Sequence, residues 1–233
     1  MVNIRKLNEE TWAIEEESVR FFLLIGTNKA ILIDSGHFCR NAREIVEQIT
    51  DLPISVLNTH ADPDHIACNH QFDTVMMNPS EFANLYSKCD EPQLMNLVTI
   101  YPESALDLGN RVIELIPLPG HTPGSVAILD TKYRVLFGGD SIQTGNIFMF
   151  GPMRNMKAYE MSLVDLLKRN LGFDFVYPSH GELPVLPEVI STLISDAQKI
   201  MNNELPFKLQ SVHGNLIRAY QGHAAVFYCD HDK

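Results

Sequence analysis

The chain has 233 residues, of which 45% are hydrophobic and 20% charged, as in globular proteins large enough to bury a core without disulfides. Lysine and arginine total 18 against 29 aspartates and glutamates, which gives a formal net charge of −11 at pH 7. This composition excludes collagen-like, coiled-coil and disordered chains. The acidic balance, without a basic cluster, also argues against broad contact with nucleic acid.

The first third of the chain predicts strands followed by a helix. Residues 19–25 and 30–33 are rich in β-forming side chains and flank a polar turn. Residues 40–50 carry apolar side chains at helical spacing, and residues 54–57 read as a short buried strand. The polar segment Asn58–His65 follows that strand directly.

The later part predicts a second set of strands and two amphipathic helices. The expected strands are residues 111–116, 125–130, 133–137 and 173–177, followed by a closing hairpin of residues 216–220 and 224–228. The expected helices are residues 156–170 and 187–202. No repeat or linker divides the sequence, so we expect one α/β or α+β domain over residues 1–233, with helices covering sheets.

The sequence favours a cytoplasmic protein with reduced thiols. The N-terminal residues include no apolar signal segment, and no apolar run approaches the length of a membrane span. No C-x-x-C pair occurs among the four cysteines, which are Cys39, Cys68, Cys89 and Cys229.

Four metal-ligand side chains lie within six residues directly after the strand at 54–57. His60 and His65 offer imidazole nitrogens, and Asp62 and Asp64 offer carboxylate oxygens. In an extended loop His60 and Asp62 can share one metal, and Asp64 and His65 can then turn toward a second as a helix begins. The alternative is that these residues only form a turn.

Three later side chains also follow strand-like runs. His121 lies in the Gly/Pro-rich turn PGHTPGS, Asp140 ends the step FGGD, and His180 lies in YPSHG. Functional side chains gather on loops at strand ends because a sheet holds such loops rigidly. These three residues are therefore further candidate ligands.

Taken together, these motifs resemble those of the metallo-β-lactamase-fold superfamily, whose first motif is T-H-x-H-x-D-H. The later turns resemble its G-H-T-x-G, G-D and P-x-H-G steps, and the segment around Asp34 resembles its early L-I-D-x-G element. The resemblance implies a four-layer αβ/βα sandwich of two facing mixed β-sheets covered by helices, with metals in a groove at one edge.

The resemblance also implies a ligand set and a reaction. His60 and His121 would hold the first metal, Asp64, His65 and His180 the second, and Asp140 would bridge both. A metal-bridging hydroxide would then hydrolyse a small ester, thioester, lactone or amide, with Asp64 orienting the water as the catalytic carboxylate. Asp34 would orient a ligand loop by accepting hydrogen bonds rather than bind metal.

Asp62 departs from the family motif, because most members have a second His there. Three ionised aspartates would leave two divalent cations with a net charge of +1, where two carboxylates would leave +2. A less positive site stabilises an anion less, and carboxylate ligands shift the preference from zinc toward iron or manganese. We therefore expect two divalent ions, with zinc as the default and iron or manganese as competitors.

Two other functions remain open. An acidic residue at position 62 is similar to the site of flavodiiron proteins, so an iron-dependent redox enzyme of that kind, or one resembling a sulfur dioxygenase, is the first alternative. A non-catalytic metal-binding module is the second. The expected partner is a small-molecule substrate, without nucleic acid or membrane, and a homodimer is possible.

Several side chains have two interpretations each. His37 and His70 can line the site or lie on the surface, and Cys68 can be a nucleophile or buried filler. The segment 147–150 can be core or the wall of a substrate pocket. We expect Tyr159 to be a core residue rather than an acid catalyst.

Overall fold

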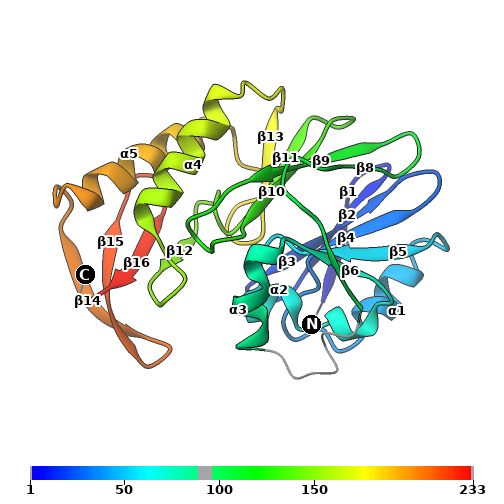
Figure 1. Cartoon of the computed structure of the whole chain (residues 1–233), viewed down its shortest axis with the longest axis horizontal. Helices are drawn as coiled ribbons and strands as arrows, with labels where there is room; N and C mark the ends of the chain where they lie inside the picture. Colours follow the sequence, from blue (N-terminus) through cyan, green and yellow to red (C-terminus); the bar gives the residue numbers. More distant parts are fainter. Residues whose placement is uncertain (1, 89–95, 232–233) are drawn as a thin grey trace. The chain divides into compact units, whose positions relative to one another are not determined.

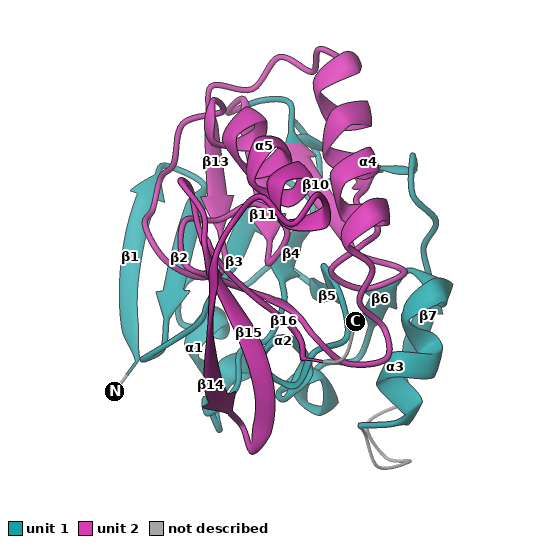
Figure 2. Cartoon of the chain, turned by 90° about the vertical axis from the view of Figure 1, so that its left-hand side faces the viewer, with its two compact units in different colours: residues 1–115, 130–132 teal, residues 116–129, 133–233 magenta. Residues whose placement is uncertain are grey.

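The computed structural model describes residues 2–88 and 96–231, which belong to two compact units (Figure 2). Unit 1 comprises residues 1–115 and 130–132, and unit 2 comprises residues 116–129 and 133–233. In the described residues no helix is long and apolar enough to cross a bilayer.

Unit 1 is built on a seven-stranded mixed sheet with the strands in chain order. Strands β1 to β4 are antiparallel to their neighbours, and β4 to β7 run parallel to one another. The strands are β1 (Asn3–Asn8), β2 (Thr11–Glu15), β3 (Arg20–Ile25), β4 (Ala30–Ile33), β5 (Ile54–Leu57), β6 (Val75–Met77) and β7 (Leu97–Thr99). A separate antiparallel hairpin joins β8 (Ala105–Asp107) to β9 (Val112–Pro117), which continues into unit 2.

Apolar side chains explain the position of helix α1 (Ala42–Glu47) in unit 1. Ala42, Ile45 and Val46 are buried on one side of this helix. They pack in one cluster with side chains of β3, β4 and β5, including Leu32 and Val56. Strand β4 is buried at every position, which is typical of a central strand covered on both faces.

The parallel strands of unit 1 bring their carboxyl ends to one edge of the sheet. Beyond β4 lies Asp34, beyond β5 lies the segment that begins at Asn58, and beyond β6 lies Asn78. Short helices follow the last two strands: α2 (Pro63–Ile66), the 3-10 turns η1 (Asn69–Gln71) and η2 (Pro79–Glu81), and α3 (Phe82–Tyr86). This edge is where open α/β sheets usually carry their ligands.

Unit 2 contains two groups of strands and two long helices (Figure 1). One group has the order β13-β11-β10, and the other has the order β12-β16-β15-β14. The strands are β10 (Val126–Asp130), which ends in unit 1, β11 (Val135–Gly139), β12 (Asn146–Met149), β13 (Phe175–Pro178), β14 (Phe207–Val212), β15 (Asn215–Gln221) and β16 (Val226–Asp230).

Helices α4 (Met156–Lys168) and α5 (Val189–Met201) lie side by side and supply much of the core of unit 2 (Figure 1). Leu163 of α4 and Leu193 of α5 are fully buried. They belong to one apolar cluster with Leu136, Val176 and Phe227 from the strands. The helical periodicity of the sequence therefore identifies most of the buried face of each helix, although Leu167, which the spacing places on that face of α4, is 44% exposed.

A buried ion pair joins distant segments of unit 1. The guanidinium of Arg111 lies 2.5 Å from a carboxylate oxygen of Asp130, and both side chains are inaccessible to solvent. Arg111 also donates hydrogen bonds to the carbonyls of Glu10 and Ile25 and to the hydroxyl of Thr11. Each buried charge is thus paired and hydrogen-bonded, as burial requires.

Most expected elements have close counterparts in the structure. The predicted strands 30–33 and 54–57 coincide with β4 and β5, and the closing hairpin corresponds to β15 and β16. The strands that were not predicted are β1, β2, β6, β7, β8, β12 and β14. Mixed sheets combined with helices confirm the α+β class.

Candidate metal centre

The segment after β5 folds so that four ligand-type side chains of unit 1 come together. His60 and Asp62 lie in the extended loop, and α2 begins at Pro63, whose fixed backbone suits the first turn of a helix. Asp64 and His65 therefore lie on that first turn. The expected change from loop to helix occurs at this point.

Distances within this segment suit a divalent cation. His60 Nε2 lies 3.6 Å from Asp62 Oδ2, and His65 Nε2 lies 3.7 Å from Asp64 Oδ2. The ring centroids of His60 and His65 are 4.0 Å apart. Two donors bound to one tetrahedral cation at about 2.1 Å lie roughly 3.4 Å apart. The donor types and their spacing therefore fit a metal.

Asp34 holds this segment from the end of β4. Its buried carboxylate accepts hydrogen bonds from the backbone N–H and the hydroxyl of Thr59, both at 2.8 Å. It also lies 2.8 Å from His65 Nδ1, while the Thr59 hydroxyl lies 2.9 Å from His60 Nδ1. With Nδ1 engaged on both rings, the Nε2 atoms are directed toward the carboxylates of Asp62 and Asp64. Asp34 thus has the orienting contacts that the sequence suggested.

Three polar side chains from η2, α3 and the residues just after it brace the same loop, and sequence reasoning missed all three. Glu81 is fully buried and accepts the Ala61 N–H at 2.8 Å. Asn84 donates to Glu81 and to Asp62 Oδ1, each at 3.3 Å. Lys88 Nζ lies 2.7 Å from Asp62 Oδ1. The spacing i, i+3, i+7 was the available signal, because it places side chains on one helical face.

Unit 2 brings its own three candidate ligands together. Strands β11 and β13 are parallel neighbours, so Asp140 and His180 follow their carboxyl ends at the same edge. His180 Nε2 lies 3.0 Å from Asp140 Oδ1, and His121 Nε2 lies 3.6 Å from Asp140 Oδ2. Asp140 therefore has a histidine on each oxygen, as a bridging ligand requires.

Helix α4 supports two of these loops from within unit 2. The backbone N–H of Asn155 bonds to the carbonyl of Gly120, and a Cβ on Gly120 would lie 2.3 Å from the backbone of Tyr159. Only glycine fits this close approach, which also has φ +140°. Tyr159 is fully buried and donates its hydroxyl to the carbonyl of Ser141. It is a core residue, as expected, and burial raises the pKa of its phenol.

The cysteine in the motif region is not placed as a nucleophile. The Cys68 side chain is buried, and its thiol donates to the carbonyl of Cys39. Burial raises the pKa of the Cys68 thiol to about 12, so the thiolate is scarce near neutral pH. These observations agree with the interpretation of Cys68 as a buried packing residue rather than a nucleophile.

The remaining candidates divide between core and surface. Ile147 and Met149 are buried in the core of unit 2, whereas Phe148 and Phe150 are half-buried. His70 is exposed and its ring contacts the carbonyl of Ala67. His37 is half-buried, and its backbone N–H bonds to Glu16.

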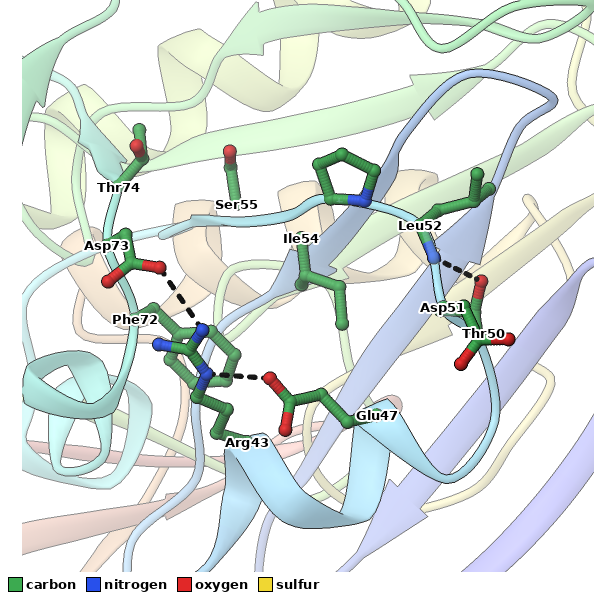
Figure 3. Close-up of a pocket in the computed structure, with 11 residues that line it drawn as sticks. Arg43, Glu47, Thr50, Asp51, Leu52, Ile54, Ser55, Phe72, Asp73 and Thr74 are labelled. Atoms are coloured by element: carbon green, nitrogen blue, oxygen red, sulfur yellow. Dashed lines mark hydrogen bonds and ion pairs between the residues drawn. The ribbon is translucent and has the colours of Figure 1, made fainter.

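A surface cavity of about 610 Å³ in unit 1 is lined by none of the candidate ligands (Figure 3). Its lining includes Ile54 at the start of β5 and Thr74 just before β6, so it lies at the amino ends of these parallel strands. Figure 3 shows Arg43 on one side, bonded to Glu47 and Asp73. Its lining within the described chain contains no His or Cys. The cavity therefore has no part in metal binding by these ligands.

Comparison with known sequences identifies a family. The sequence profile described as the metallo-beta-lactamase superfamily matches residues 15–80 and 83–180, which include every candidate ligand. The acyl-coenzyme A thioesterase MBLAC2 of Homo sapiens is 22% identical over 68% of this chain and 71% of its own length. The same-named protein of Gallus gallus is 32% identical over 32% of this chain, and the match spans only 28% of that protein. A probable metallo-hydrolase of Methanocaldococcus jannaschii is 27% identical over 70% of this chain and 87% of its own length.

Comparison with solved structures supports the same fold. A metallo-beta-lactamase from Pontibacter korlensis has a TM-score of 0.68 and 21% identity, covering 85% of this chain and 99% of its own. Similarity at this identity establishes the fold and no more. It confirms the fold expected from the five motifs.

Proposed function

The chain belongs to the metallo-β-lactamase superfamily, and from this premise we propose that it is a dinuclear metal-dependent hydrolase of a small carbonyl substrate. The proposed ligands are His60, Asp62, Asp64, His65, His121, Asp140 and His180. The arrangement of the Asn58–His65 segment carries the proposal: two buried imidazoles have Nδ1 engaged and Nε2 directed toward carboxylates. This arrangement fits metal binding far better than the alternative that these residues only form a turn.

Among ester, thioester, lactone and amide substrates, we favour an acyl thioester. Relatives from Homo sapiens and Gallus gallus are named acyl-coenzyme A thioesterases, and that name is the reason for the choice. Within a shared fold, the loops around the pocket determine the substrate. The relatives' name therefore selects the first substrate to assay but does not establish it.

The protein side chains have separate roles in this proposal. Divalent cations, when bound, would polarise the substrate carbonyl and lower the pKa of a water molecule. Asp64 would orient that water and accept its proton, because its side chain is 31% exposed, the most accessible carboxylate in the segment. Asp34 and Thr59 would keep both rings in the binding tautomer.

The test combines metal analysis with a thioesterase assay. Protein purified without added metal should contain about two equivalents of zinc, iron or manganese and should hydrolyse an acyl-coenzyme A. His60→Ala in unit 1 and His121→Ala in unit 2 should each lower both the metal content and the rate. The control is His213→Ala, an exposed histidine on the turn between β14 and β15.

Other outcomes would select the alternatives. Iron with oxygen or nitric oxide turnover, and no hydrolysis, would favour a redox enzyme. Bound metal without turnover of any ester, thioester, lactone or phosphoester would favour a metal-binding module. If the protein binds no metal, or if only one of the two histidine variants loses it, the seven-residue assignment is wrong.

A further inference from the structure

Asp62 is the one departure from the family motif, and it has a basic neighbour of its own. Its Oδ2 lies 3.6 Å from His60 Nε2, on the side of the candidate metal. Its other oxygen, Oδ1, lies 2.7 Å from Lys88 Nζ and 3.3 Å from Asn84 Nδ2. The two carboxylate oxygens therefore face different chemistry.

The ion pair is well shielded for one that involves a lysine. The side chain of Asp62 is 11% exposed and that of Lys88 is 28% exposed. Charges in such partly buried positions interact more strongly than at the surface, because water screens them less. An ammonium at 2.7 Å from Oδ1 therefore offsets part of the carboxylate charge that a nearby cation would feel.

Lys88 shares its partner atom, Asp62 Oδ1, with Asn84. Asn84 bonds to both Glu81 and Asp62, and Glu81 holds the backbone of Ala61. Glu81 and Asn84 thus contact the backbone and the side chain of the metal loop, and Lys88 joins them at the Asp62 carboxylate.

We infer that Lys88 is a positioning and charge-compensating residue. By pairing with Oδ1, it makes Asp62 bind metal through Oδ2 alone and with little net charge, at the position where most family members have a histidine. Counting three aspartates alone gives a filled site a charge of +1, and including Lys88 restores +2. The inference rests on the proposed metal site. It predicts that a filled site with Asp62 and Lys88 has the same net charge as a filled site with histidine at position 62.

Chelator competition tests the inference without an activity assay. The dissociation constants of Zn²⁺ and Mn²⁺ are measured for wild type, Lys88→Met, Lys88→Arg and Lys168→Met. Loss of the compensating charge should tighten binding of both ions in Lys88→Met, on the order of tenfold. Lys88→Arg keeps the charge and should bind like wild type. Lys168→Met, at an exposed position on α4, changes the net charge equally and should have no effect.

The direction of the change separates the inference from a purely structural role. If Lys88 only stabilised the loop, Lys88→Met would bind metal more weakly or equally, and either result overturns the inference. Equally tighter binding by Lys168→Met overturns the inference as well, because the effect would then come from the net charge of the protein. If wild type binds metal and Lys88→Met does not differ, only this inference fails. If wild type binds neither ion, the proposed function fails with it.

Circular dichroism of Lys88→Met distinguishes misfolding from an electrostatic effect. A native spectrum is expected, because Lys88 lies beyond the end of α3 and is partly exposed. Should that variant unfold, Asp62→Asn gives the complementary test. It removes the carboxylate charge but leaves Lys88, so binding of both ions should weaken relative to wild type, and unchanged or tighter binding would overturn the inference.

Discussion

Asp34 is the residue that holds the candidate ligand loop of unit 1 in position. A single carboxylate contacts the Thr59 backbone, the Thr59 hydroxyl and the His65 ring. Its backbone has φ +62°, in the left-handed region that aspartate and asparagine tolerate better than most residues. This conformation turns the carboxylate back toward the loop after β5.

Asp34→Asn should weaken metal binding while the fold is kept. Asparagine accepts the left-handed backbone but removes the negative charge beside His65 Nδ1, and loss of such contacts costs about 10- to 100-fold in metal affinity. Metal content after dialysis against chelator is the measurement. Asp174→Asn, in an exposed pair with Arg134, is the control. Equal metal retention by the two variants would contradict the role of Asp34.

Cys68 should be dispensable for hydrolysis. Its thiol pKa is raised to about 12 by burial, so the thiol is protonated across the neutral range and only loses its proton as the pH approaches that value. Cys68→Ala should therefore retain the wild-type rate. At pH 8, iodoacetamide should modify Cys68 in the denatured protein but not in the folded one. Rapid labelling of folded protein with loss of activity would point to a nucleophile instead.

At the residue scale, sequence reasoning found the ligand candidates and Asp34 but missed the other supports of the loop. His60, Asp64 and His180 could be identified because motif residues follow strand ends in a recognisable order. The spacing of Glu81 and Lys88 places them on one helical face, but their partners lie more than 19 residues away, so only folding shows what that face contacts. The charge argument about Asp62 was incomplete for the same reason.

At the element scale, the buried Arg111–Asp130 pair connects the start of β9 to the end of β10 and to the turns that flank β2 and β3. Arg111→Met should destabilise the protein by about 3–5 kcal/mol, because it leaves the Asp130 carboxylate buried and unpaired. Urea denaturation gives the free energy of unfolding directly.

Two further variants check the origin of that loss. Replacing both partners, with Arg111→Met and Asp130→Leu, should recover part of the stability because neither charge is left buried. Arg134→Met breaks an exposed pair with Asp174 and should destabilise the protein much less, because water screens that pair. Equal losses for Arg111→Met and Arg134→Met would mean that burial is not the cause.

Elements with a clear apolar pattern were predicted well, and those without one were missed. Helix α5 was expected at 187–202 and spans Val189–Met201, because its apolar stripe recurs at helical spacing. Strand β14 is exposed at nearly every position, and its apolar alternation stops after Phe207 and Leu209, so its sequence resembles a loop. Backbone pairing with β15 makes it a strand.

At the scale of the whole molecule, we expect one unfolding transition that depends on metal. The sequence predicts a single domain, and a metal that binds only the folded chain adds to its stability. Removing metal with a chelator should lower the melting temperature by about 5–10 °C in differential scanning calorimetry. Chelator presaturated with Zn²⁺ is the control. Two separate transitions, with only one sensitive to metal, would contradict the single-domain prediction.

The superfamily could be recognised from the sequence alone, because so many motifs in the family's order between Asp34 and His180 would rarely occur together by chance. The register of the sheets could not, because the partner of each strand depends on packing between segments that are distant in sequence. Strands β12 and β16 illustrate this limit, since they pair in parallel across some eighty residues.

The contacts of Arg111 also set an order of events during synthesis on the ribosome. Its guanidinium joins Glu10 and Thr11 near the amino terminus to Asp130. These contacts can therefore form only after more than half of the polypeptide has left the exit tunnel. Nascent chains halted before Asp130 emerges should be digested readily by protease, and those halted well beyond it should resist.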